Sequence, residues 1–180
     1  MKNGEFRLPI AILAFILILG LLLGSFTLYN KLGIVEPLSK KLYLIEAVDE
    51  VNIDKDKLYN IEIKLGKLND VQKTYQEIIT TIETKLDNDA YQLKILDNSN
   101  SKLDELLISL QPAIYEALAS HQFIWLDEHL NSITEKMEVS HLLFVDDENL
   151  YIQLIDADSY IYSILERPSG VYTKTSGGIK

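Results

Sequence analysis

The segment YNIEIKL, residues 59–65, carries the clearest structural pattern in this chain of 180 residues. Its apolar and polar side chains alternate strictly, which is the period of a β-strand with one buried and one solvated face. Val51 and Ile53 alternate in the same way just before it. The polar residues 54–57 separate the two runs. We therefore predict a β-hairpin at this point.

Helical spacing flanks the predicted hairpin on both sides. The residues before it favour a short amphipathic helix over 38–49. After it, Asn69 and Gln72 form a capping box that opens a helix over 70–87, and a strand follows over 91–95. A longer helical region covers 101–137. Pro112 is expected to kink or divide that region near Leu110, and a second break is expected near Ser120.

The last third of the chain changes to the period of β-strands. Apolar runs at 142–145, 151–155 and 160–165 are separated by the short polar segments 146–149 and 156–159. Short polar separators between such runs predict hairpins, and therefore a three-stranded antiparallel meander. The fold class that follows is α+β, one mixed domain with a β-hairpin, helices and a C-terminal meander.

The expected element order over 38–96 is α-β-β-α-β. This order is similar to that of the ring-building modules in some membrane-associated secretion and sporulation rings. Many small α+β folds share the same order, so no family is inferred from it.

An apolar run near the N-terminus predicts a transmembrane helix. No charged side chain lies between Arg7 and Lys31, and the run is longer than the about 7–15 apolar residues of a cleaved signal peptide. We expect a short tail at 1–7, a transmembrane helix at 8–29, a connector at 30–37, an extracytoplasmic domain at 38–167 and a flexible tail at 168–180. The expected location is the cell membrane, with a single pass and the C-terminal domain outside the cytoplasm.

Charge and composition exclude several classes of protein. The formal net charge is −10, so the surface would repel nucleic-acid phosphates. The chain has no cysteine, which excludes disulfide scaffolds, thiolate zinc sites and cysteine nucleophiles. The expected partners are the lipid bilayer and another envelope protein or a second copy, with no nucleic acid and no cofactor.

The search for catalytic and metal-binding residues gives no committed site. His121, His129 and His141 are the only histidines, and the first two lie too far apart along one helix to share an ion directly. The carboxylates in the turns at 146–148 and 156–158 could bind a hard cation, but successive meander turns lie at opposite ends of the strands, and Asp is also an ordinary turn residue. No catalytic residue and no metal ligand is therefore predicted.

Two pairs of residues are candidate contact sites. Gly20 and Gly24 form a G-x-x-x-G pattern that lets a second membrane helix approach closely. Tyr160 and Tyr162 share one face of the last strand, where they form either a protein interface or ordinary sheet packing. We expect a non-catalytic protein that mediates protein–protein interaction or the assembly of an envelope complex. The alternatives are a membrane-tethered hydrolase or metal-dependent enzyme, and a ligand-sensing domain.

Overall fold

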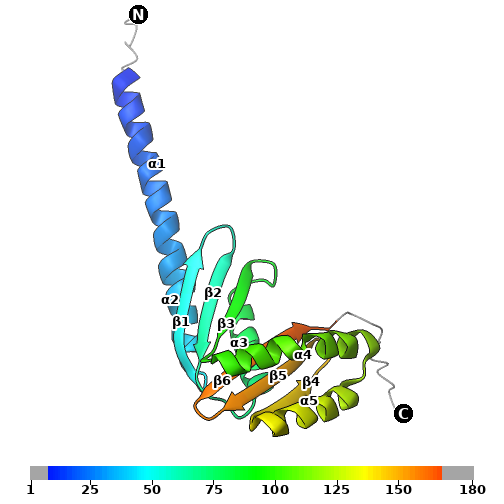
Figure 1. Ribbon diagram of the computed structural model, residues 1–180. Helices are drawn as coiled ribbons and strands as arrows, with labels where there is room; N and C mark the ends of the chain where they lie inside the picture. The colour runs from blue at the N-terminus through cyan, green and yellow to red at the C-terminus, as the bar shows by residue number, and fades with distance from the viewer. Residues whose placement is uncertain (1–7, 168–180) are drawn as a thin grey trace, which may run out of the picture.

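The structure is a computed structural model that describes residues 8–167 (Figure 1). The predicted tails at 1–7 and 168–180 lie outside the described residues. The elements in chain order are α1 (Leu8–Asn30), the π-helix η1 (Lys31–Val35), α2 (Glu36–Leu42), β1 (Val48–Lys55), β2 (Tyr59–Leu65), α3 (Val71–Glu83), β3 (Tyr91–Leu96), α4 (Ser101–Ser120), α5 (Phe123–Met137), β4 (Ser140–Val145), β5 (Asn149–Asp156) and β6 (Ser159–Glu166).

The first half of the α+β part is a three-stranded sheet of order β1-β2-β3. β1 and β2 form the expected antiparallel hairpin, and β3 runs parallel to β2 after the crossover through α3. The alternation in 59–65 has the predicted result, because Ile61, Ile63 and Leu65 are fully buried whereas Asn60 and Lys64 are exposed. Helices α2 and α3 pack on the buried face.

The second half is the predicted antiparallel meander, of strand order β4-β5-β6. Helices α4 and α5 pack on one face of this sheet. The buried side chains of this core are mostly leucines from both helices together with alternate residues of β5, Leu150, Ile152 and Leu154.

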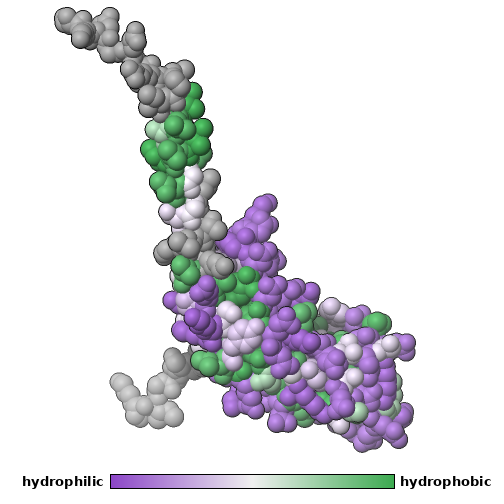
Figure 2. Space-filling model, turned by 90° about the vertical axis from the view of Figure 1, so that its left-hand side faces the viewer, coloured by the Kyte–Doolittle hydropathy of each residue, from purple (hydrophilic) through white to green (hydrophobic). Residues whose placement is uncertain are grey.

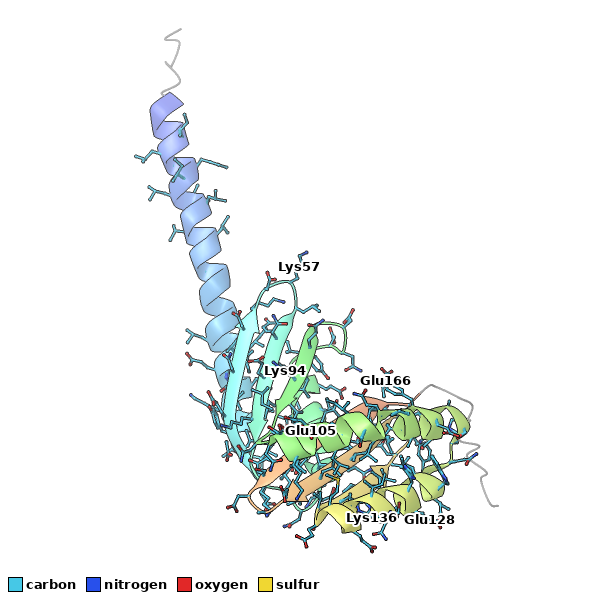
Figure 3. The ribbon with its side chains drawn as sticks, viewed as in Figure 1. Lys57, Lys94, Glu105, Glu128, Lys136 and Glu166 are labelled. Atoms are coloured by element: carbon cyan, nitrogen blue, oxygen red, sulfur yellow. The ribbon has the colours of Figure 1, made fainter. Side chains whose placement is uncertain are left out.

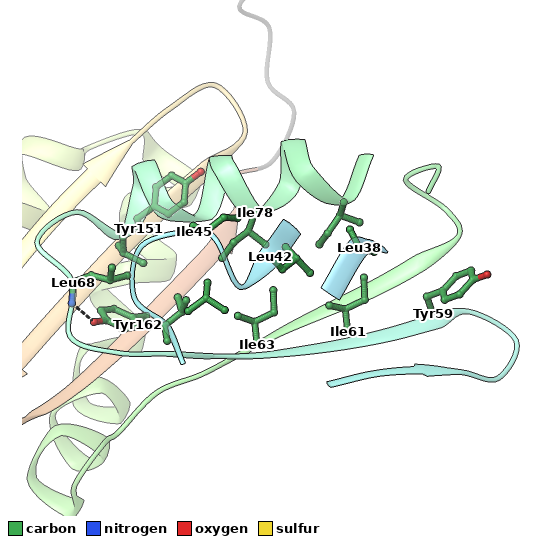
Figure 4. Close-up of a cluster of buried hydrophobic side chains, with 14 of the residues drawn as sticks. Leu38, Leu42, Ile45, Tyr59, Ile61, Ile63, Leu68, Ile78, Tyr151 and Tyr162 are labelled. Carbon is green, nitrogen blue, oxygen red and sulfur yellow. Dashed lines mark hydrogen bonds between the residues drawn. The ribbon is translucent and has the colours of Figure 1, made fainter. Parts of the chain in front are cut away.

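The other face of the second sheet joins the core of the first half. Tyr151, Tyr160 and Tyr162 project from β5 and β6 into the cluster that also holds Ile63 and Ile78. Figure 4 shows this cluster and the hydrogen bond between Tyr162 and Leu68. The second sheet is therefore buried on both faces, with one core cluster on each, and its tyrosine face belongs to the core of the first half.

Most predicted elements are confirmed, and two differ. The predicted helix over 38–49 ends at Leu42, because Val48 enters β1 and pairs with Leu65. Pro112 does not divide α4, which continues to Ser120. Pro112 lies on the exposed side of α4, where water can pair with the carbonyl that a proline leaves free. The break expected near Ser120 is present, since His121 caps α4 in the left-handed conformation.

The segments that precede the α+β part differ from the expectation more strongly. The predicted connector at 30–37 is helical, with η1 followed directly by α2. Within residues 8–167, no helix combines the length and the apolar character that crossing a bilayer requires. The exposed apolar side chains of α1 within 12–22 form an apolar surface on this helix (Figure 2). The lack of such a helix among residues 8–167 contradicts the predicted transmembrane helix at 8–29 and the single-pass location, and the extracytoplasmic placement of the domain loses the span on which it rested.

Candidate functional site

A cleft opens between β3 and β6, which are edge strands of the two sheets. We call it the β3–β6 cleft. Helix α3 and the turn between β4 and β5 complete its walls. Its volume is about 1390 Å³, above the roughly 300–1,000 Å³ of most small-molecule pockets. The half-buried apolar side chains that line it are Tyr75, Ile79, Leu93, Ile95 and Ile164.

The two strands meet at one end of the cleft and diverge from there (Figure 1). At the junction, the Tyr160 N–H donates to the Asn98 carbonyl over 3.0 Å. The Tyr162 N–H donates to the Asp97 carboxylate over 3.1 Å. Beyond Tyr162, no strand covers the outer edge of β6 within the described residues. The cleft is therefore a wedge whose closed end is fixed by main-chain pairing.

Main-chain groups of β3 point into the cleft. The Tyr59 N–H donates to the Ala90 carbonyl, so the residues of β3 with even numbers pair with β2. Alternate residues of a strand direct their main-chain groups to opposite sides. The N–H and C=O groups of Leu93 and Ile95 therefore face away from β2, toward the opening. On β6, the same alternation directs the main-chain groups of Ile164 outward, because Tyr160 and Tyr162 already point that way.

Charged groups at the rim of the cleft are mostly acidic. Its walls carry five carboxylates and two cations. Lys94 pairs with Glu62 at 3.1 Å, and the Arg167 guanidinium donates to the Asp146 carbonyl while lying over the ring of Phe123. The two cations are thus already engaged by the protein itself.

Asp146 anchors the β4–β5 turn to the wall of the cleft. Its carboxylate accepts hydrogen bonds from the Tyr151 hydroxyl at 2.7 Å, from the Gln76 amide at 2.9 Å and from the N–H groups of Glu148 and Asn149. Burial acts to raise the pKa of Asp146, but these hydrogen bonds outweigh it and lower the pKa to about 2. Burial, together with the hydrogen bond to Asp146, raises the pKa of the Tyr151 hydroxyl.

Acid is expected to release this anchor. Because the pKa of Asp146 is lower in the folded chain than its ordinary value of 3.8, its contribution to stability is complete above about pH 4 and is lost as the pH falls toward 2. Asp146→Asn should lower the free energy of unfolding by roughly 1 kcal/mol at pH 7, allowing for solvent screening. It should also flatten the fall in melting temperature between pH 4 and pH 2. Asp158→Asn, at an exposed turn at the other end of the meander, removes the same charge as a control. Identical pH profiles for Asp146→Asn and the unmodified chain would contradict the anchor.

The predicted interface residues Tyr160 and Tyr162 lie in the core. Their exposed fractions are 7% and 8%, and their rings pack against each other with centroids 5.3 Å apart. The Tyr160 hydroxyl donates to the Leu65 carbonyl, and the Tyr162 hydroxyl contacts the Gly66 carbonyl and the Leu68 N–H. The sequence allowed either a protein interface or ordinary sheet packing for this pair, and the buried positions of both rings favour sheet packing. The pair contacts the chain's own β2–α3 connection.

Gly20 and Gly24 lie on α1, away from the cleft. A Cβ atom built on either glycine meets nothing within 4 Å in the structure. Helix pairing at these glycines stays a prediction. The apolar side chains around them are exposed, from 44% at Leu19 to 70% at Leu21. Contiguous exposed apolar surface of this kind is typical of surfaces that another molecule covers.

The histidines do not form a catalytic or metal site with one another. His121 caps α4, and the ring of His129 stacks on Trp125 with centroids 5.3 Å apart. His141 lies 2.9 Å from the Thr134 hydroxyl and 3.4 Å from the Asp127 carboxylate. This arrangement resembles a hydroxyl–histidine–carboxylate relay, but Thr134 is only 1% exposed, so a substrate cannot reach its hydroxyl.

The first carboxylate of each acidic turn is committed to the fold. Asp146 is held as described above, and Asp156 binds Lys102 at 2.9 Å and Asn100 at 3.0 Å. Among residues 8–167, no group of three or more histidine, aspartate or glutamate side chains could hold a metal ion. Asp146 and Asp156 therefore have structural roles, in fixing the β4–β5 turn and in holding Asn100, the N-cap of α4.

Sequence reasoning placed Leu93 and Ile95 on a strand but did not identify them as site residues. Their role depends on β3 being an edge strand, and strand order cannot be read from periodicity. β3 presents a free edge because it is the last strand in the order β1-β2-β3 among residues 8–167. Comparison with protein-family models, with curated proteins and with solved structures finds no match for this chain.

Proposed function

We propose that the chain is a non-catalytic protein-interaction module that binds an extended segment of a partner protein, or of a second copy, in the β3–β6 cleft. The segment adds to the first sheet as a fourth strand beside β3. The observation that carries this proposal is the outward direction of the main-chain groups of Leu93 and Ile95 into a cleft. Strand addition uses such groups for affinity and pockets for alternate side chains for specificity.

The walls of the cleft support this function. Natural sheets protect free edges with proline, charged side chains such as lysine, bulges or covering elements, and the one lysine of β3, Lys94, is paired with Glu62. β3 has the sequence YQLKIL, without proline, and its register with β2 is regular over all of its pairs. Tyr75 and Ile79 of α3 offer apolar contacts beside this edge to the side chains of an added strand. The edge is therefore regular, competent for hydrogen bonding and provided with side-chain contacts.

Peptides methylated on main-chain nitrogen test the proposal. The probe is a fluorescein-labelled decapeptide that alternates valine and threonine, titrated with the full chain up to millimolar concentration. One derivative carries N-methyl groups on the central valines, and the other carries them on the central threonines. A strand added to β3 presents only alternate N–H groups to it, so one derivative should bind at least tenfold more weakly and the other should bind nearly as well as the parent peptide.

The readout is fluorescence anisotropy, and the parent peptide without methylation is the control. Equal losses in both derivatives, no loss in either, or no binding of the parent peptide would each contradict strand addition at β3. A partner that binds as a helix or through side chains alone would not give the alternating result.

A further inference from the structure

Four of the carboxylates around the β3–β6 cleft have no ion-pair partner among residues 8–167. Glu83, Asp147, Glu148 and Glu166 are exposed and line the cleft. Among residues 8–167, none of the four forms an ion pair, whereas the cations Lys94 and Arg167 have the contacts described above. The cleft therefore presents a net negative field to any segment that enters it.

The four carboxylates come from three different walls. Glu83 lies at the end of α3, Asp147 and Glu148 lie in the β4–β5 turn, and Glu166 ends β6. Figure 3 shows Glu166 at the end of β6, across the opening from Lys94 on β3. The apolar contacts from Tyr75, Ile79 and Ile164 lie in the same cleft. An occupant thus meets apolar side chains and carboxylates together.

We propose, on the basis of the proposed strand addition, that the segment bound in the β3–β6 cleft is basic. In this segment, lysine or arginine alternates with apolar residues. In a strand, side chains point alternately to the two faces. The apolar residues of such a segment face α3, and its cations on the other face lie beside the Lys94–Glu62 pair and within the field of the carboxylates at the rim. An acidic segment with the same apolar pattern places like charges together and is rejected.

Binding of three matched peptides tests the charge preference. Each alternates valine with a polar residue, which is lysine in the first peptide, threonine in the second and glutamate in the third. With the full chain, we expect the lysine peptide to bind at least tenfold more tightly than the threonine peptide and the glutamate peptide to bind more weakly than both. Raising the salt from 0.1 M to about 1 M should remove most of this difference, because the screening length falls from about 10 Å to about 3 Å.

Charge-neutralising variants locate the effect in the cleft. Glu83→Gln/Glu166→Gln should weaken binding of the lysine peptide about fivefold and leave the threonine peptide unchanged. Glu105→Gln/Glu128→Gln is the matched control, because it removes two charges from exposed glutamates on α4 and α5 that do not line the cleft (Figure 3).

The outcomes separate this inference from the proposed function. Binding of the threonine peptide with no preference for lysine, or an equal loss in the two double variants, overturns the basic partner and leaves strand addition intact. Failure of the threonine peptide to bind overturns strand addition itself. A preference for lysine that is lost only in Glu83→Gln/Glu166→Gln supports the inference.

Discussion

Tyr162→Ala is expected to lower the free energy of unfolding by about 3–5 kcal/mol, the usual cost of removing a large aromatic ring from a core. The ring of Tyr162 is 8% exposed and lies where the interior of the first half meets β6. Its hydroxyl is 2.8 Å from both the Gly66 carbonyl and the Leu68 N–H. The alanine variant creates a cavity and also leaves these two buried main-chain groups without partners. Urea denaturation followed by circular dichroism measures the change.

Two variants separate the hydroxyl of Tyr162 from its ring. Tyr162→Phe keeps most of the packing and should cost about 1–3 kcal/mol, because the two main-chain groups lose their partner. Tyr115→Ala removes a tyrosine that is 62% exposed on α4 and should change stability by no more than about 0.5 kcal/mol. A cost below about 1 kcal/mol for Tyr162→Ala would show that the ring lies at the surface, as an interface residue would.

Ile63→Ala is expected to cost about 2–5 kcal/mol, since Ile63 is fully buried in the middle of β2. Its neighbour Lys64 projects from the opposite, exposed face of the strand. Lys64→Ala should therefore stay within about 0.5 kcal/mol of the unmodified chain. The two variants change adjacent positions on opposite faces of β2, and urea denaturation measures the free energy of unfolding of each. Similar costs for the two variants would contradict the two-faced strand at 59–65.

Local periodicity predicted the elements that depend on one buried face. The alternation in 59–65 and the turns at 146–149 and 156–159 gave the hairpin and the meander correctly. The capping prediction was less successful. Asp70 caps α3 by accepting from the Lys73 N–H, where Asn69 was expected. Neighbouring Asn and Asp offer the same acceptor chemistry, so composition alone could not choose between them.

Properties that depend on long-range contacts were not accessible from the sequence. Tyrosine is a common interface residue, so the sequence allowed Tyr160 and Tyr162 to form an interface. In the structure, the β2–α3 connection packs against them, and their hydroxyls donate to main-chain carbonyls within the chain. The cleft likewise depends on the parallel pairing of β3 and on the bridge between Asn98 and Tyr160. The apolar run at 8–29 predicted a bilayer span, which the described helices contradict.

The acidic residues fall into two groups, those bonded within the chain and those exposed at the cleft. Asp146 and Asp156 are held by hydrogen bonds within the chain and fix a turn and a helix start. Glu83 and Glu166 are exposed and form no ion pair within the described part of the chain. The sequence could not separate these two groups, because all are carboxylates in polar segments. Their partners distinguish the residues that stabilise the fold from those available to a ligand.

Amide hydrogen exchange at β3 is the most direct test of strand addition. The exchange of the Leu93 and Ile95 amides would be followed by NMR in the full chain, with and without the lysine–valine peptide. We expect both amides to exchange at least tenfold more slowly when the peptide is bound, because they gain partners, whereas Gln92 and Lys94 should change little because they already pair with β2. Unchanged exchange at Leu93 and Ile95 in the presence of saturating peptide would contradict strand addition at this edge.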